Sequence, residues 1–167
     1  MRRIAMMLAI MTMMAATTKA QDNADRIGAD VTAHFRPAAS ATLFWEHETR
    51  YHNAWEVSVT GSVKLDNLED LRANYKCWGV GAAWKPCLYR AKNRYGSARI
   101  GVSLGAAPTD FLAGIHAGWQ HNYALKRGWQ FYWQAGVDVM LPRRDDLFRA
   151  GAGIGVKLPV RDRLRRR

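Results

Sequence analysis

Hydrophobic and polar residues alternate along most of the chain after residue 30. In one example, Val57 and Val59 alternate with Ser58 and Thr60. Because successive side chains of a β-strand point to opposite faces, this period of two predicts strands with one apolar and one polar face. Six segments show the pattern clearly: Trp55–Lys64, Cys77–Lys85, Arg99–Gly105, Phe111–Gln120, Trp129–Leu141 and Phe148–Leu158.

Two weaker alternating segments, Val31–Arg36 and Ala39–Glu46, precede these six. Leu65–Asn74 has leucines at helical spacing, so it is either a short helical turn or a long loop. Residues typical of turns separate the strands, and we expect turns at Lys85–Pro86, Asn93–Ser97, Ala107–Asp110, Lys126–Gly128 and Pro142–Asp146. Eight strands joined by short turns predict an all-β fold, an eight-stranded antiparallel up-and-down β-barrel.

The polar face of the expected strands indicates which way the barrel faces. It is rich in glycine, for example at Gly101, Gly118 and Gly136. Glycine makes room inside a narrow barrel, whereas on a solvated outer face it weakens a strand for no gain. The apolar face carries no Asp, Glu or Arg, and such charges are costly against lipid. We therefore predict an outer-membrane type of β-barrel; the alternative is a soluble barrel whose apolar face surrounds a ligand cavity.

Tryptophans lie on the apolar face, mostly near the ends of strands. Membrane barrels carry girdles of aromatic side chains where the bilayer meets water. The residues that we expect at these interfaces are Trp45, Trp55, Trp78, Trp84, Trp119 and Trp129. On this interpretation, the lipid bilayer of the outer membrane is a partner of the chain.

The N-terminus has the pattern of a secretory signal peptide. Arg2 and Arg3 precede an almost wholly apolar run, Ile4–Ala16, and small residues allow cleavage after Ala20. A membrane anchor helix is the alternative, but spanning takes about 20 apolar residues and this run is shorter. We expect a signal peptide at residues 1–20, a linker at 21–29, the barrel at 30–160 and a basic tail at 161–167. Export then leads to a bacterial outer membrane.

The chain is basic, with 25 Lys and Arg against 14 Asp and Glu and a formal net charge of +11. Loss of Arg2, Arg3 and Lys19 with the signal peptide lowers this charge to +8. Nucleic-acid binding favours basic and aromatic residues on one face, whereas the tryptophans here lie opposite the charges. We therefore expect no direct nucleic-acid partner. The run Arg165–Arg167 is either solvated or in contact with lipid phosphates or a partner protein.

Charges of both signs on the polar face would have to pair inside the barrel. The polar network that we expect in the lumen consists of Glu46, Glu56, Arg99, His116, Asp138, Arg149 and Lys157. Its role is structural, or else catalytic in an outer-membrane lipid hydrolase or acyltransferase that uses His116 or His121. The sequence shows no hydroxyl–histidine–carboxylate spacing, so we expect no enzymatic activity. A filled eight-stranded lumen also argues against a porin.

We expect no cofactor and no metal, because metal-ligand spacing is absent among His47, His52, His116 and His121. Ten residues of extended strand span about 33 Å, whereas the Cα atoms of a disulfide lie within about 7 Å of each other. Cys77 and Cys87 could pair only if the chain bends back near Lys85–Pro86, and we expect two unpaired thiols.

Three segments in the second half of the chain follow one another in an order that is similar to that of a known family. They are the strand pair Tyr75–Lys85 and Ser97–Ala106, the hairpin Gln120–Trp129, and the closing strand Phe148–Leu158 with its Gly-x-Gly-x-Gly-x-Lys-Leu pattern. Together they resemble the TraO family of conjugal transfer proteins over roughly Trp55–Leu158, although the loop at Ala107–Asp110 is shorter and the basic tail departs from the family pattern.

This resemblance implies an exported accessory or structural component of a conjugative DNA-transfer apparatus. Its partners would be other proteins of that apparatus, and the family suggests no catalytic residues. The alternative is a small outer-membrane barrel of unrelated role.

Overall fold

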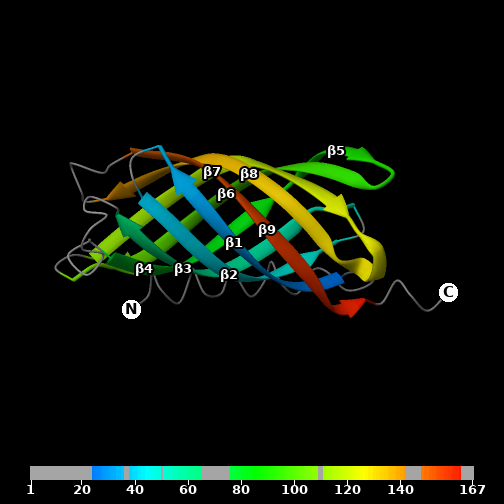
Figure 1. Cartoon of the computed structure of the whole chain (residues 1–167), viewed down its shortest axis with the longest axis horizontal. Coiled ribbons are helices and arrows are strands. Elements are labelled where there is room, and N and C mark those ends of the chain that lie inside the picture. Colours follow the sequence, from blue (N-terminus) through cyan, green and yellow to red (C-terminus); the bar gives the residue numbers. More distant parts are fainter. Residues whose placement is uncertain are drawn as a thin grey trace, which may run out of the picture.

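A computed structural model describes residues 24–35, 38–49, 51–64, 76–108, 111–141 and 148–162. Most of these residues lie in tilted antiparallel strands (Figure 1). The strands are β1 (Ala24–His34), β2 (Ala38–Glu48), β3 (Ala54–Lys64), β4 (Lys76–Lys85), β5 (Cys87–Ala91), β6 (Arg94–Ala106), β7 (Phe111–Ala124), β8 (Gln130–Leu141) and β9 (Phe148–Asp162). A turn of 3-10 helix, Lys126–Gly128, lies between β7 and β8.

The strands close into a ring of eight. Pairing runs in sequence order from β1 to β4 and from β6 to β9. β1 also pairs with β9 along its length, and β4 pairs with β6, so that the sheet has no open edge in the ring. This eight-stranded antiparallel barrel confirms the fold that the alternation predicts.

β5 lies outside the ring and pairs with the first residues of β6. The β5–β6 hairpin extends past the other strands at one end of the barrel (Figure 1). The turn expected at Lys85–Pro86 is therefore wrong, because the chain continues through Pro86 and turns at residues 92–93. Proline lacks an N–H donor, so Pro86 interrupts the ladder, while the residues on both sides of it remain extended. Arg94–Ser97, expected as part of a turn, belongs to β6.

The barrel also extends beyond the expected range of residues 30–160. β1 begins at Ala24, so residues 24–29 are strand rather than linker. The alternation continues back through this segment, where Arg26 and Gly28 are buried and Ile27 is exposed. β9 continues to Asp162, which pairs with Ala24.

Some expectations concern residues outside the described ranges. These are the signal peptide at 1–20, the segment Leu65–Asn74, the turn at Pro142–Asp146 and residues 163–167 of the basic tail. Within the part of the chain that the structure describes, no helix is long and apolar enough to cross a membrane.

The two ends of the barrel differ, and we name them by their connections. The terminal end carries Ala24 and Asp162, the start of β1 and the end of β9. The opposite end, where β1 leads into β2 and β8 into β9, is the loop end. The β5–β6 hairpin extends from the terminal end (Figure 1).

Large aromatic rings enter the lumen where the facing strand carries glycine. Phe44 lies opposite Gly28, and Tyr132 lies opposite Gly155. A Cβ added at Gly28 would stand 2.2 Å from the Phe44 ring, and one at Gly155 would stand 2.4 Å from the Tyr132 ring. Both glycines are therefore required for the rings to lie flat against the inner wall.

Candidate functional site

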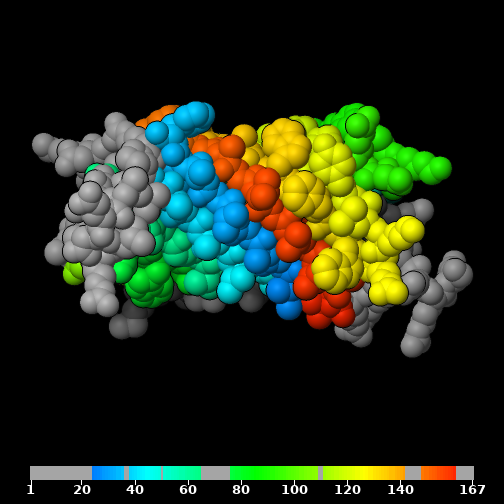
Figure 2. Space-filling view, viewed as in Figure 1, coloured from blue at the N-terminus to red at the C-terminus, as the bar shows by residue number. Residues whose placement is uncertain are grey.

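The outer wall of the barrel is apolar. Along each strand, exposed apolar side chains alternate with side chains that point inward. Near the middle of the barrel, Val59 is 54% exposed and Val102 is 59% exposed. Figure 2 shows one side of this wall, where side chains of β1, β9 and β8 pack as adjacent tilted bands.

The expected interfacial tryptophans gather mainly near the terminal end. Trp45, Trp55, Trp84 and Trp129 are between 42% and 48% exposed there, and the stacked rings of Trp55 and Trp84 lie 6.2 Å apart. Trp78 lies at the loop end, where the exposed rings of Phe35, Phe111 and Phe148 also lie. Trp119 packs over Gly96 on the outer wall. Aromatic side chains therefore border the apolar wall at both ends. The prediction from the sequence named only tryptophans and did not include these phenylalanines.

The two histidines considered for lipid hydrolysis lie on opposite faces of the wall. His121 belongs to an outer aromatic cluster, in which its ring stacks on Trp133 at 5.7 Å and lies 4.9 Å from Tyr123. His116 points into the lumen, where its Nδ1 lies 2.6 Å from Oδ1 of Asp138. The two side chains therefore cannot belong to one site.

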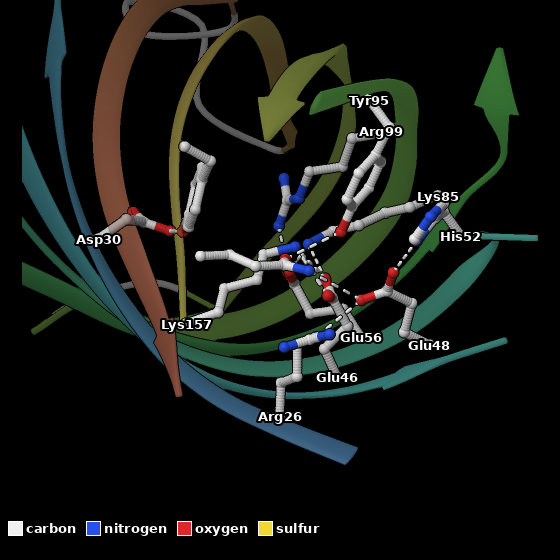
Figure 3. A network of polar contacts seen from close by, with 12 residues as sticks. Arg26, Asp30, Glu46, Glu48, His52, Glu56, Lys85, Tyr95, Arg99 and Lys157 are labelled. Atoms are coloured by element: carbon white, nitrogen blue, oxygen red, sulfur yellow. Dashed lines mark hydrogen bonds and ion pairs between the residues drawn. The ribbon is translucent and has the colours of Figure 1, made fainter. Parts of the chain in front are cut away.

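The terminal half of the lumen is filled by charged side chains centred on Glu46, which is fully buried (Figure 3). Lys85 donates to one carboxylate oxygen of Glu46 at 2.6 Å, and Lys157 donates to both oxygens at 2.7 and 2.9 Å. Lys85 also contacts Glu56, which accepts a further hydrogen bond from Arg99 at 2.8 Å. The ammonium and carboxylate groups thus form a continuous chain across the barrel.

A second arm of this network surrounds Glu48. Nε of Arg26 donates to Glu48 at 2.7 Å, and the amide of Gln130 donates to the same oxygen at 3.3 Å. The ring of His52 contacts the other oxygen of Glu48 and stacks on Tyr95 at 4.2 Å. Arg26 and Glu48 lie near the terminal ends of β1 and β2, and Figure 3 shows them with His52 beside Glu46 and Glu56.

Aromatic rings support the two lysines of the network. Nζ of Lys85 lies 5.0 Å from the centre of the Phe44 ring, and Nζ of Lys157 lies 5.2 Å from that of Tyr132. The hydroxyl of Tyr132 donates to Asp30 at 2.8 Å. We call the eight charged residues of this region the charge plug: Arg26, Asp30, Glu46, Glu48, Glu56, Lys85, Arg99 and Lys157. Its four acidic and four basic groups balance, as buried charges require.

The structure divides the lumen network expected from the sequence into two groups. Glu46, Glu56, Arg99 and Lys157 lie in the charge plug, whereas His116 and Asp138 pair on the loop side of it. Arg149 lies opposite Asp138 on the neighbouring strand. Sequence reasoning missed Arg26 and Asp30, because it placed the start of the first strand too late. The alternation through residues 24–30 was the signal that could have found them.

A cavity of about 120 Å³ lies in the lumen on the loop side of the charge plug. Hydroxyl groups line much of it, together with His34, Arg99, His116, Asp138 and Arg149. These side chains suit water or a small polar ligand. Among the described residues, no group of three His, Cys, Asp or Glu side chains could hold a metal ion.

Cys77, near the start of β4, and Cys87, two residues beyond its end, are free thiols. The strand between them is extended, which keeps their sulfur atoms too far apart for a disulfide. Cys87 begins β5, outside the ring of eight strands, and burial raises the pKa of its thiol.

Comparisons with known proteins support the fold and no particular activity. No family model matches the chain, and no curated protein matches it. A solved structure described as "De novo design of transmembrane beta-barrels" is similar, with a TM-score of 0.52 and 8% sequence identity, over 85% of this chain and 98% of that chain. The chain therefore has the fold of a small transmembrane-type β-barrel.

Proposed function

We propose that the chain is an integral outer-membrane protein whose barrel spans the bilayer. The carrying observation is the distribution of its side chains: charges fill the lumen, while exposed valine, leucine and isoleucine cover the wall. In water this arrangement would bury charge and expose apolar surface, both of which are unfavourable. In a bilayer the same wall faces hydrocarbon, and the aromatic residues at both ends face the headgroups.

Cell fractionation tests this proposal. Expressed with its own N-terminus, the protein should sediment with outer membranes and should change its mobility on an SDS gel when boiled, as a closed barrel that unfolds does. A soluble periplasmic protein in the same lysate is the control. Recovery in the periplasmic supernatant would contradict the proposal and favour a soluble barrel.

The barrel should not conduct ions. Glu46, Glu56 and Lys85 lie in the charge plug and are 3% exposed or less, so water does not reach them from either end of the lumen. In a planar lipid bilayer the purified protein should give no conductance steps, whereas a porin added to the same membrane should. Stable channels from the unmodified protein would contradict a closed lumen.

Within this setting we propose a non-conducting accessory or structural role in a conjugative DNA-transfer apparatus. The resemblance of Trp55–Leu158 to the TraO family is the reason for this part of the proposal. Deletion of the gene in a donor strain should lower the frequency of plasmid transfer, and a plasmid-borne copy should restore it. Unchanged transfer would contradict the conjugative role and would leave the membrane barrel unaffected.

A further inference from the structure

Three side chains on neighbouring strands form a hydrogen-bonded chain in the lumen cavity. Nε2 of His116 on β7 lies 2.7 Å from Oγ of Ser103 on β6, and Nδ1 of His116 lies 2.6 Å from Oδ1 of Asp138 on β8. All three residues line the cavity. A hydroxyl on one ring nitrogen and a carboxylate on the other is the arrangement that activates a serine nucleophile.

The register of the barrel produces this arrangement. Asp138 lies directly opposite His116, and Ser103 lies opposite Gly114, one inward position away from His116 along β7. A Cβ at Gly114 would stand 2.7 Å from Oγ of Ser103. Gly114 therefore leaves the space in which the serine hydroxyl can turn toward the imidazole ring.

His116 and Asp138 are more accessible than the centre of the charge plug. The side chain of His116 is 19% exposed and that of Asp138 is 28% exposed, whereas Glu46 and Lys157 are almost completely buried. The cavity could admit a small molecule to the serine.

We propose that Ser103 is a nucleophile that hydrolyses short-chain carboxylic esters, with His116 as its general base and Asp138 as a positioning residue. Asp138 accepts a hydrogen bond from Nδ1–H of His116, which leaves Nε2 free to accept the proton of Ser103. As Oγ bonds to the ester carbonyl carbon, its proton passes to Nε2. The ester C–O bond then breaks, and the leaving alcohol takes that proton.

Water completes the cycle from the resulting acyl-serine. His116 takes a proton from the water, whose oxygen bonds to the acyl carbon and releases the carboxylic acid. The proton returns to Oγ of Ser103, so water is the only co-reactant. A cavity of about 120 Å³ limits the substrate, because sites for drug-sized ligands hold roughly 300–1,000 Å³. We therefore assign acetyl-sized acyl groups rather than long lipid chains.

The same cavity offers a matched control. Oγ of Ser40 lies 3.1 Å from Nε2 of His34, but Nδ1 of His34 is buried without a hydrogen-bond partner among the described residues. Ser40 and His34 thus repeat the hydroxyl–imidazole pair without a carboxylate hydrogen-bonded to the ring. Comparison with Ser103 and His116 therefore tests what that hydrogen bond contributes.

The first test is covalent labelling of the purified, folded barrel with a fluorophosphonate probe, followed by peptide mass spectrometry. The proposal expects the label on Ser103, its loss in Ser103→Ala, and its retention in Ser40→Ala. Folding of each variant is checked by gel mobility before boiling. Because the labelled serine is identified in the unmodified chain, the result does not depend on a variant that folds.

The second test is hydrolysis of p-nitrophenyl acetate. Ser103→Ala should reduce turnover to the rate without protein, and His116→Gln should lower kcat about 10²–10⁴-fold. Asp138→Asn should lower kcat with little change in KM, whereas Ser40→Ala keeps Ser103, His116 and Asp138 and should still hydrolyse the ester. An unlabelled Ser103, or equal activity in Ser103→Ala and Ser40→Ala, would overturn the proposal. It would also leave standing the expectation from the sequence that the chain has no enzymatic activity.

Discussion

Replacement of Glu46 by glutamine removes the central charge of the plug while almost preserving its shape. In the structure, the Glu46 carboxylate binds both Lys85 and Lys157, and all three side chains are 2% exposed or less. Lys85 keeps its contact with Glu56 in the variant. Both hydrogen bonds of Lys157 to Glu46 go to this carboxylate. In the variant, Lys157 is therefore less well compensated than Lys85.

Removal of one partner from a buried ion pair costs about 3–5 kcal/mol, because the other charge stays in the lumen without compensation. Glu46→Gln should therefore lower the free energy of unfolding by about 3–5 kcal/mol, a large share of the stability of a domain of this size.

Urea unfolding of the barrel in lipid vesicles, followed by tryptophan fluorescence, measures this change. Lys157→Met and the double variant complete a thermodynamic cycle. Because the double variant no longer carries the uncompensated ammonium group, it should be about 2–3 kcal/mol more stable than additivity predicts. A loss below about 1 kcal/mol for Glu46→Gln, or an additive cycle, would refute the argument that these charges hold each other in the lumen.

Further predictions concern the inner wall, the outer wall and the thiols. Gly28→Ala places a methyl group against the Phe44 ring and should cost about 1–3 kcal/mol in the same urea assay. Gly61→Ala, whose added Cβ meets nothing within 4 Å, should stay within about 0.5 kcal/mol. Val59→Arg puts a charge at the middle of the outer wall and should lower the free energy of unfolding in vesicles by about 2–4 kcal/mol. Leu125→Arg, beside the terminal end, should lower it by about 0–1 kcal/mol. Equal losses would contradict a lipid-facing wall. Burial raises the pKa of the Cys87 thiol and so reduces its thiolate fraction. Maleimide should therefore modify Cys87 more slowly in the folded protein than in urea, and the rate should rise with pH. An equal rate in both states would count against this burial.

Period-two alternation was sufficient to predict the closed barrel, because the two faces of each strand meet different environments, the lumen and the outside of the wall. It also assigned Glu46, Glu56, Arg99 and Lys157 to the lumen. It could not show that Lys157 on the last strand binds Glu46 on the second, since that contact depends on how β1 closes on β9. Pairings across a closure depend on register and tilt, which are not local properties of the sequence.

The same limit explains why Ser103, His116 and Asp138 were not recognised as a group. They are separated by 13 and 22 residues, distances set by the lengths of β6, β7 and β8 and their connections. Such spacing matches no short motif, because the hydrogen bonds run across strands rather than along one. The turn predicted at Pro86 was wrong for a different reason. Proline is a common turn residue, yet here it lies in an extended segment between β4 and β5.

The order of the plug residues along the chain has a consequence for how the barrel assembles. Asp30, Glu46, Glu48 and Glu56 face three basic groups on the strands up to β6, and the fourth basic group, Lys157, arrives with β9. A sheet that has not yet joined β9 to β1 therefore holds an unneutralised acid in its concave face. Closure of the ring and neutralisation of its interior occur in one step, which disfavours a half-closed intermediate in a bilayer.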